Sequence, residues 1–216
     1  THGTDITKGV KKNQVINFNK FAKNWADAVR YNGQEELGNL QREKDRNIQK
    51  RILVLDYTSP DPSRDAGSYA AIQEIKLMQS LGFKVTFATD NLAHLGELTT
   101  NLQRMGVETL YAPFYISVEQ VLSRRLPEMD AVYITRYYVA QNFLDRIKAI
   151  KPSIPVLFNN ADLHFLRELR AAKTEEDQTK ALQTRTQELE ICQKVDAVLC
   201  YNSTEHAVIA SHLPGN

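Results

Sequence analysis

The sequence predicts an α/β domain built on an open, mostly parallel sheet with helices on both faces. The main evidence is a set of short, continuous apolar runs, which are typical of strands buried on both sides. Stretches with helical periodicity separate these runs, and strands that alternate with helices form right-handed parallel units. We expect the first strand to lie at the centre of the sheet, with no antiparallel hairpin among the first five. The expected strands are residues 51–56, 84–89, 107–111, 131–135, 155–158 and 197–201.

Two of the intervening stretches have a clear apolar stripe at helical spacing. The stripe in residues 68–81 ends at Gly82, a residue that commonly terminates helices, and a second stripe covers residues 138–150. Residues 162–195 are expected to form one long or broken helix that is densely charged near its middle.

Residues 1–50 are expected to be a helical extension or linker in front of a sheet domain at 51–216. The first thirteen residues are polar and expected to be mobile. A helix is expected at 14–30, with Val15, Phe18, Trp25 and Val29 on one face. A second, charged helix is expected at 35–50. Two interpretations remain: a helical pair that packs on a neighbouring domain, or a helix that binds a specific partner.

The composition excludes several classes of protein. With 42% hydrophobic and 25% charged residues, the chain has the balance of an ordinary globular domain. A net charge of +1 provides no overall field for nucleic acid or an anionic membrane. Cys192 and Cys200 fit neither a disulfide framework nor a zinc site, which favours a reducing, cytoplasmic compartment. We find no membrane-spanning apolar run. Both ends of the chain, Thr1 and Asn216, suggest a piece of a larger enzyme.

The familiar nucleotide-binding and hydrolase motifs are absent. A dinucleotide site needs Gly-x-Gly-x-x-Gly directly after the first strand, whereas this loop holds only Gly67, eleven residues after Asp56. Asp90 stands where a ribose-binding acid would, but without the glycines the signal is weak. There is no phosphate-binding Gly-x-x-x-x-Gly-Lys-Ser/Thr, no His-x-x-x-His and no Gly-x-Ser-x-Gly.

Candidate site residues follow the strands, because ligands of parallel sheets bind beyond the carboxyl ends of the strands. The first loop leads into Ala66, Gly67 and Ser68, which open a helix whose free amides favour an anion such as phosphate. An ordinary N-cap formed by Asp65 is an equal alternative. The other candidates are Asp65, Asp90, Arg136, Tyr137, Asn160, Asp162, His164, Ser203 and Glu205.

Four segments resemble retaining, bacterial glycosyltransferases with the two-domain GT-B fold, of the kind grouped as family 4. Residues 162–170, Asp-Leu-His-Phe-Leu-Arg-Glu-Leu-Arg, carry the most specific likeness, and residues 56–68, 84–92 and 106–115 agree in order and spacing. The resemblance covers about residues 51–214. It departs from the family at Ala66, where Ser is usual. It also departs at Asn159-Asn160, where Asp-Thr is common.

The resemblance implies that 51–216 is the Rossmann-like, acceptor-side domain of such an enzyme. A second domain, absent from this chain, would hold most of the nucleotide-sugar donor. His164 is implied to be catalytic, facing the donor sugar, and Ala66, Gly67 and Ser68 to contact the donor phosphate. The first helical turn should disfavour the imidazolium form of His164. The remaining candidates are implied to contact the acceptor or line the cleft.

Simpler structural roles stay open for several of these residues. His164 would then be a histidine packed at a helix start, and Asp162 more plausibly caps that helix than acts as a base. Ser203 and Glu205 would belong to an N-cap, and the tyrosines after the fourth strand would lie at the core edge.

The implied function is transfer of a hexose from a nucleotide sugar to a glycan or lipid-linked acceptor. The expected reaction retains the anomeric configuration and uses no metal or cofactor. Its expected setting is polysaccharide biosynthesis for the cell envelope, in the cytoplasm or peripherally at the inner membrane face. No nucleic acid partner is expected, and the isolated chain should be inactive. The alternative function is a non-catalytic binding or scaffold module of a multidomain protein.

Overall fold

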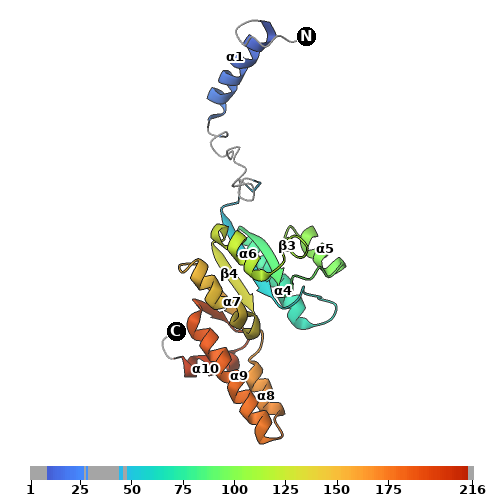
Figure 1. Cartoon of the computed structure of the whole chain (residues 1–216), viewed down its shortest axis with the longest axis vertical. Coiled ribbons are helices and arrows are strands. Elements are labelled where there is room, and N and C mark those ends of the chain that lie inside the picture. The colour runs from blue at the N-terminus through green and yellow to red at the C-terminus, as the bar shows by residue number, and fades with distance from the viewer. Residues whose placement is uncertain (1–8, 27, 29–43, 46–47, 214–216) are drawn as a thin grey trace. The chain divides into compact units, whose positions relative to one another are not determined.

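A computed structural model describes residues 9–26, 28, 44–45 and 48–213 of the chain (Figure 1). The chain divides between Gln49 and Lys50 into two units, which are described separately. Among the described residues, no helix is long and apolar enough to cross a bilayer.

The first unit contains the helix α1 (Gly9–Asn24). The helix thus begins at Gly9, five residues before the helix expected at 14–30. Most of the charged helix expected at 35–50 lies outside the described residues, as does Val29. At its carboxyl end that expectation is wrong, since residues 44–45 form a turn and Lys50 already belongs to a strand.

The second unit is built on a six-stranded sheet in the order β3-β2-β1-β4-β5-β6. Every recorded strand pair is parallel, and β1 lies inside the sheet between β2 and β4. These observations confirm the expected α/β class, the parallel sheet and the central first strand. The strands are β1 (Lys50–Asp56), β2 (Phe83–Thr89), β3 (Glu108–Leu110), β4 (Ala131–Thr135), β5 (Val156–Asn159) and β6 (Ala197–Leu199).

Helices occupy the connections between the strands. The expected helix at 162–195 is broken into two, because Thr174 and Asp177 form a capping box that starts a new helix. Two helices, α5 and α6, were not delimited from the sequence. The helices are α4 (Ala66–Ser80), α5 (Glu97–Arg104), α6 (Val118–Arg125), the short 3₁₀ helix η2 (Leu126–Glu128), α7 (Tyr137–Ile150), α8 (His164–Ala171), α9 (Glu175–Lys194) and α10 (Ser203–His212).

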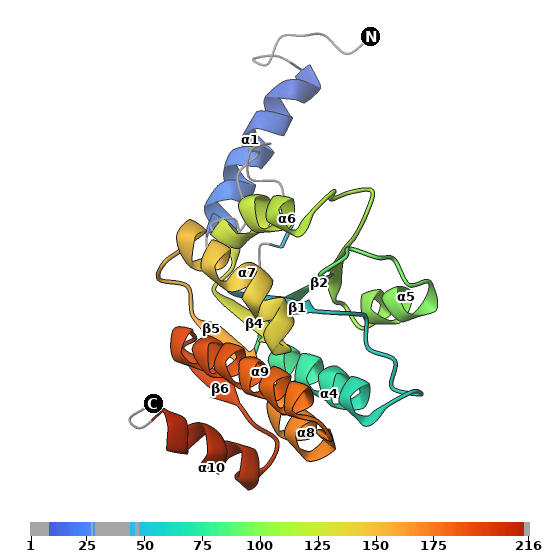
Figure 2. The same cartoon turned by 60° about the horizontal axis from the view of Figure 1, so that its bottom comes forward.

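The continuous apolar run of β1 follows from burial on both faces of the sheet. Leu53 and Leu55 join the core formed with α6, α7 and α9 on one face (Figure 2). Ile52 and Val54 join the core formed with α4 and α5 on the other. Each of these buried side chains contributes on the order of 2 kcal/mol of hydrophobic stabilisation.

The parallel arrangement places the loops that follow all six strands at one edge of the sheet, which we call the carboxyl edge. Backbone hydrogen bonds join neighbouring loops there, as between the Arg136 amide and the Asn159 carbonyl at 3.0 Å. Three non-glycine residues have positive φ angles at this edge: Leu92 (53°), Arg136 (74°) and Ala161 (60°). Because such backbone strain concentrates at functional sites, it marks the carboxyl edge as a candidate site.

Candidate functional site

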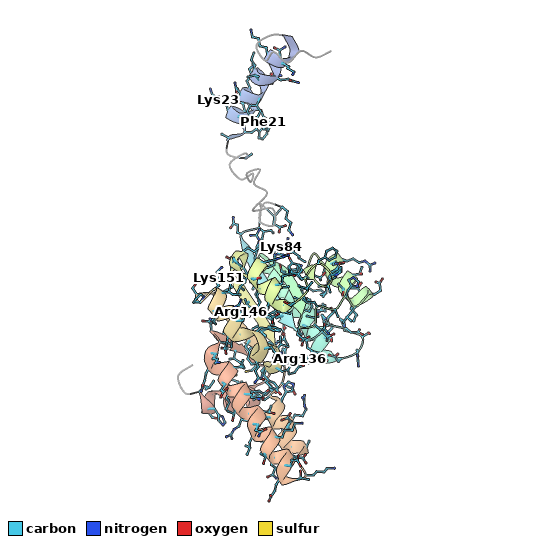
Figure 3. The ribbon with its side chains drawn as sticks, in the orientation of Figure 1. Phe21, Lys23, Lys84, Arg136, Arg146 and Lys151 are labelled. Atoms are coloured by element: carbon cyan, nitrogen blue, oxygen red, sulfur yellow. The ribbon has the colours of Figure 1, made fainter. Side chains whose placement is uncertain are left out.

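An ion pair joins two strands at the carboxyl edge. Arg136, labelled in Figure 3, donates from Nε to Oδ1 of Asp56 at 3.0 Å. Burial raises the pKa of Asp56, against the opposing effect of the Arg136 charge. Burial alone would lower the pKa of Arg136, but the Asp56 charge and hydrogen bond raise it overall. The guanidinium therefore stays charged and also interacts with the hydroxyl of Tyr138.

A buried amide beside this pair ties α4 to β4, β5 and the loop after β6. Nδ2 of Asn159 lies 2.9 Å from the Tyr133 hydroxyl, 2.8 Å from the Tyr201 hydroxyl and 3.0 Å from Oε1 of Glu74. An amide nitrogen has two protons and cannot donate to all three at once. The Tyr201 hydroxyl itself donates to Glu74, so this carboxylate has a donor even when the Asn159 amide donates to the two tyrosines. Burial raises the pKa of Tyr201 to about 12, so this hydroxyl is a neutral donor.

Four rings form a continuous row from the loop after β1 to the start of α8. Tyr57 packs edge-to-face on Tyr138 with ring centroids 5.7 Å apart, and Tyr138 packs on Tyr137 at 5.4 Å. His164 meets both of the latter, at 5.1 Å from Tyr137 and 6.0 Å from Tyr138. Edge-to-face contacts of this kind favour fixed ring orientations. The row links His164 to the Arg136 ion pair through Tyr138.

Glu188 of α9 caps the amino end of α8. Its Oε1 accepts the amide of His164 at 2.9 Å and its Oε2 accepts the amide of Phe165 at 3.0 Å. Asp162 instead pairs with Arg167, and the N-cap residue Leu163 provides no side-chain hydrogen bond. The expectation that Asp162 caps this helix is therefore wrong. A carboxylate from the neighbouring helix does so.

The environment of His164 also corrects an expectation. Its ring Nδ1 lies 3.1 Å from the Asp162 carbonyl oxygen and 3.3 Å from Oε1 of Glu188. Burial lowers the pKa of His164, but the hydrogen bond to Glu188 and the charges of Asp162 and Glu188 outweigh it, so the pKa is raised. The carboxylates thus reverse the expected effect of the helix amino end. His164 is also only 9% exposed, which fits the simpler alternative of a histidine packed at a helix start.

In the loop expected to hold phosphate, Ser68 already has a hydrogen-bond partner. Asp65 accepts the Ser68 amide at 2.7 Å with one oxygen and the Ser68 hydroxyl at 3.0 Å with the other, and these bonds lower its pKa. Asp65 is thus the N-cap of α4. A Cβ at Gly67 would lie 3.3 Å from Oδ1 of Asp65, so glycine relieves a tight approach. Phosphate binding by Ala66, Gly67 and Ser68 stays a prediction, and a phosphate at Ser68 would compete with Asp65.

Asn160 and Glu205 form a second contact between the last two loops. Nδ2 of the buried Asn160 donates to Glu205 at 3.2 Å, and Glu205 also accepts the Leu163 amide at 3.4 Å. Oδ1 of Asn160 is buried and has no hydrogen-bond partner among the described residues. Asn202 caps α10 through the Glu205 amide, while Ser203 is exposed in the first turn.

Asp90 lies away from this group. Its amide bonds the Asp56 carbonyl at 3.0 Å, and burial raises its pKa. The sheet order separates it from His164, however, because β1 and β4 lie between the strands that these residues follow. The structure thus brings together Arg136, Tyr137, Asp162 and His164, with Asn160 and Glu205 next to Leu163, and leaves Asp90 and Ser203 apart.

Several site residues have no local sequence signal. Glu74, Tyr133 and Tyr201 belong to the ordinary patterns of their elements and meet only through the fold. Glu188 is different, because it falls on the buried stripe of α9 between Thr184 and Ile191. A glutamate at a core-facing position of a helix requires a partner, and this signal could have identified it.

A cavity of about 540 Å³ lies between α8 and the amino end of α10. Asp162 and Glu205 line it together with Arg167 and Arg170, so both signs of charge face the space. Asp162 and Leu163 belong to both the cavity wall and the segment that holds His164. The cavity therefore adjoins the candidate site.

The chain matches no known protein-family model and no curated protein. Across the part of the chain that the structure describes, no group of three histidine, cysteine or acidic side chains is arranged to hold a metal ion.

Proposed function

We propose that this chain is the acceptor-side domain of a retaining glycosyltransferase. The enzyme would move a sugar from a nucleotide-sugar donor to a glycan or lipid-linked acceptor without a metal. The observation that carries the proposal is the row of rings from Tyr57 to His164 beside the Arg136–Asp56 pair. The two ends of the row, Tyr57 and His164, lie in segments 56–68 and 162–170, which resemble the family.

The chemistry of the row fits a carbohydrate. A sugar ring offers apolar C–H faces and a periphery of hydroxyls, which can use aromatic faces and charged hydrogen-bonding groups respectively. Tyr57 is 49% exposed and offers a ring for stacking. Arg136 is partly exposed beside it and can donate to hydroxyl oxygens. The residues supply apolar contact and directional bonds side by side.

His164 supplies a fixed ring nitrogen in this arrangement. Asp162 and Glu188 engage Nδ1, which leaves Nε2 as the ring nitrogen for a ligand. Nε2 accepts a hydrogen bond from a sugar hydroxyl when the ring is neutral and donates to a sugar oxygen when it is protonated, and the raised pKa of His164 favours the protonated form. Because Tyr137 and Tyr138 pack on the ring, its position is set before a ligand arrives, which favours catalysis by positioning.

Carboxylates at two helix amino ends support the acceptor-side assignment. Asp65 occupies the amino end of α4, and Glu188 occupies that of α8. A diphosphate would meet these negative charges at the ends that usually bind phosphate. The main grip on the diphosphate is therefore assigned to a second domain, as the resemblance implies.

The same observation favours a second candidate, a non-catalytic module that binds neutral glycans. Such a module needs aromatic faces and hydroxyl partners but no phosphate site. Transfer activity separates the two candidates, because both predict that glycans contact Tyr57 and Arg136.

The test is a transfer assay on the complete protein that contains this chain, with UDP-, GDP- and dTDP-sugars as donors. We expect transfer with retained configuration, and a loss of about 100-fold in turnover for His164→Gln, as for removal of one preorganised donor elsewhere. Tyr57→Ser should raise KM for the acceptor with little change in kcat. Glycan binding that depends on Tyr57, without transfer from any donor, would assign the binding module instead.

A further inference from the structure

The helix α1 in the first unit exposes a set of large apolar side chains. Phe18 is 69% exposed, Phe21 55% and Trp25 58%, and Val15 is 41% exposed. At 3.6 residues per turn these four positions fall within one face of the helix and its first following turn. Exposed apolar faces of this kind mark sites of interaction rather than ordinary solvated surface.

The opposite face is basic. Lys12, Lys20 and Lys23 lie there at helical spacing, accompanied by asparagines and by the exposed Ile16, whereas Lys11 falls on the apolar face. Residues 9–26 include no aspartate or glutamate. Phe21 and Lys23, both labelled in Figure 3, represent the two faces. The net charge of +1 for the whole chain therefore conceals a local concentration of positive charge.

This combination distinguishes between possible occupants of the apolar face. Helices that pair with a copy of themselves favour aliphatic seams flanked by charges of both signs. The exposed face of α1 is instead mainly aromatic, and residues 9–26 offer no acidic side chain for the interhelical ion pairs of such a seam. Aromatic residues opposite lysines are the composition of helices that lie in the interface of an anionic bilayer. Tryptophan in particular favours the headgroup level.

We propose that α1 binds the surface of an anionic lipid bilayer. Phe18, Phe21 and Trp25 enter the boundary between headgroups and acyl chains, and Lys12, Lys20 and Lys23 contact the negative headgroups. The helix lies in the plane of the membrane, and it attaches the chain peripherally. This proposal stands on α1 alone and does not depend on glycosyl transfer.

Trp25 provides a direct readout, because it is the single tryptophan of the chain. The experiment titrates the 216-residue chain with vesicles of phosphatidylcholine alone, or with about one-third phosphatidylglycerol. We expect a blue shift of Trp25 emission and co-sedimentation with the anionic vesicles. Raising the salt concentration should weaken binding, because salt screens the lysine charges.

Two variants test the two faces separately. Phe18→Ser with Phe21→Ser keeps the tryptophan and should abolish the blue shift. Lys12→Gln, Lys20→Gln and Lys23→Gln together should weaken binding to anionic vesicles by about tenfold or more at low salt.

Matched controls remove aromatic rings and lysine charges from the second unit instead. Tyr69→Ser with Phe114→Ser removes two exposed rings, and the charge control replaces exposed lysines by glutamine. Both controls should bind vesicles as the unchanged chain does. The charge control carries Lys76→Gln, Lys173→Gln and Lys180→Gln.

Three results would overturn the proposal. The first is an unshifted Trp25 emission with anionic vesicles at low salt. The second is binding that the α1 variants and the controls weaken equally. The third is concentration-dependent self-association that Phe18→Ser with Phe21→Ser abolishes in the absence of vesicle binding, which would assign a second copy of the chain to this face.

Discussion

Glu188 holds His164 at two points: Oε1 accepts the backbone amide of His164 at 2.9 Å and lies 3.3 Å from Nδ1 of its ring. One buried carboxylate thus caps the amino end of α8 and orients the residue proposed to face the sugar. The cap and the site share the same atoms, so the stability of this loop and its proposed activity are coupled.

Removing the Glu188 carboxylate should destabilise the domain. Glu188→Ala leaves the amides of His164 and Phe165 buried without their acceptor, and we expect the free energy of unfolding to fall by about 3 kcal/mol. Glu188→Gln keeps one acceptor oxygen and should cost less. Urea denaturation measures both changes. Glu190→Ala, at an exposed position of the same helix, is the control and should stay within about 0.5 kcal/mol. Equal losses for Glu188→Ala and Glu190→Ala would contradict the proposed cap.

The pH dependence of stability should carry the signature of His164. Because its folded-state pKa is raised, the folded chain binds a proton more tightly than the unfolded chain. The resulting stabilisation is fully present below the unfolded-state pKa, about 6.5, and is lost as the pH rises through the higher folded value. Urea denaturation between pH 5 and pH 9 should show this loss, and His164→Gln should remove it. An unchanged profile in His164→Gln would assign the effect to another group.

The sequence was sufficient for the strands but not for the environment of His164. Residues such as Leu53 and Val54 predict a buried strand because their pattern is local and both faces need apolar side chains. The state of His164 depends on Glu188, 24 residues away along the chain. The local rule, that a helix amino end disfavours an imidazolium, was applied correctly but outweighed by a carboxylate that only the packing of α9 on α8 supplies.

For the site residues too, the sequence predicted the edge of the sheet at which they lie but not the contacts they make. Parallel topology placed Arg136 and His164 at one edge, because loops after parallel strands share a side of the sheet. The assignment of Asp162 as a cap failed because Arg167 competes for its carboxylate. The tie between Asn159 and Glu74 could not be predicted, since it joins β5 to the middle of a helix 85 residues earlier.

Arg136 should show two separable effects, one of its side chain and one of its backbone. Arg136→Ala removes the ion pair and leaves Asp56 buried without its charge partner, while the backbone keeps a φ of 74°. Arg136→Gly removes the same side chain but permits that φ without strain. We expect the glycine variant to be more stable than the alanine variant by about 1 kcal/mol. Both should be less stable than the unchanged chain at neutral pH.

A further variant, at Asp56, measures the contribution of the ion pair between Asp56 and Arg136. Asp56→Asn combined with Arg136→Ala removes the unpaired charge and should recover part of the loss, as measured in a double-mutant cycle by urea denaturation. If alanine is as stable as glycine at position 136, the backbone strain is not significant. Additive losses in the cycle would mean that the ion pair contributes nothing.

Nucleotide sugars should bind this chain weakly on its own. Asp65 and Glu188 place negative charge at the amino ends of α4 and α8, where a diphosphate would otherwise bind. We expect calorimetry with UDP-, GDP- and dTDP-sugars to give millimolar affinity at best, roughly −4 kcal/mol. Micromolar affinity would place the donor site in this domain and contradict the acceptor-side assignment.

A substitution at Asp65 asks whether Ala66, Gly67 and Ser68 contact the donor phosphate at all. Asp65→Asn removes the negative charge but keeps an oxygen that can accept the Ser68 amide, so the cap of α4 survives. If the phosphate rests at this helix end, the variant should bind nucleotide sugars more tightly than the unchanged chain, because a like charge has been removed beside the ligand. Asp61→Asn is the matched control, since Asp61 lies in the same loop and accepts hydrogen bonds from Ser63 instead. Tighter binding in Asp65→Asn alone supports the phosphate role. Equal affinity in both variants leaves Asp65 and Ser68 as an ordinary helix cap and moves the donor phosphate elsewhere.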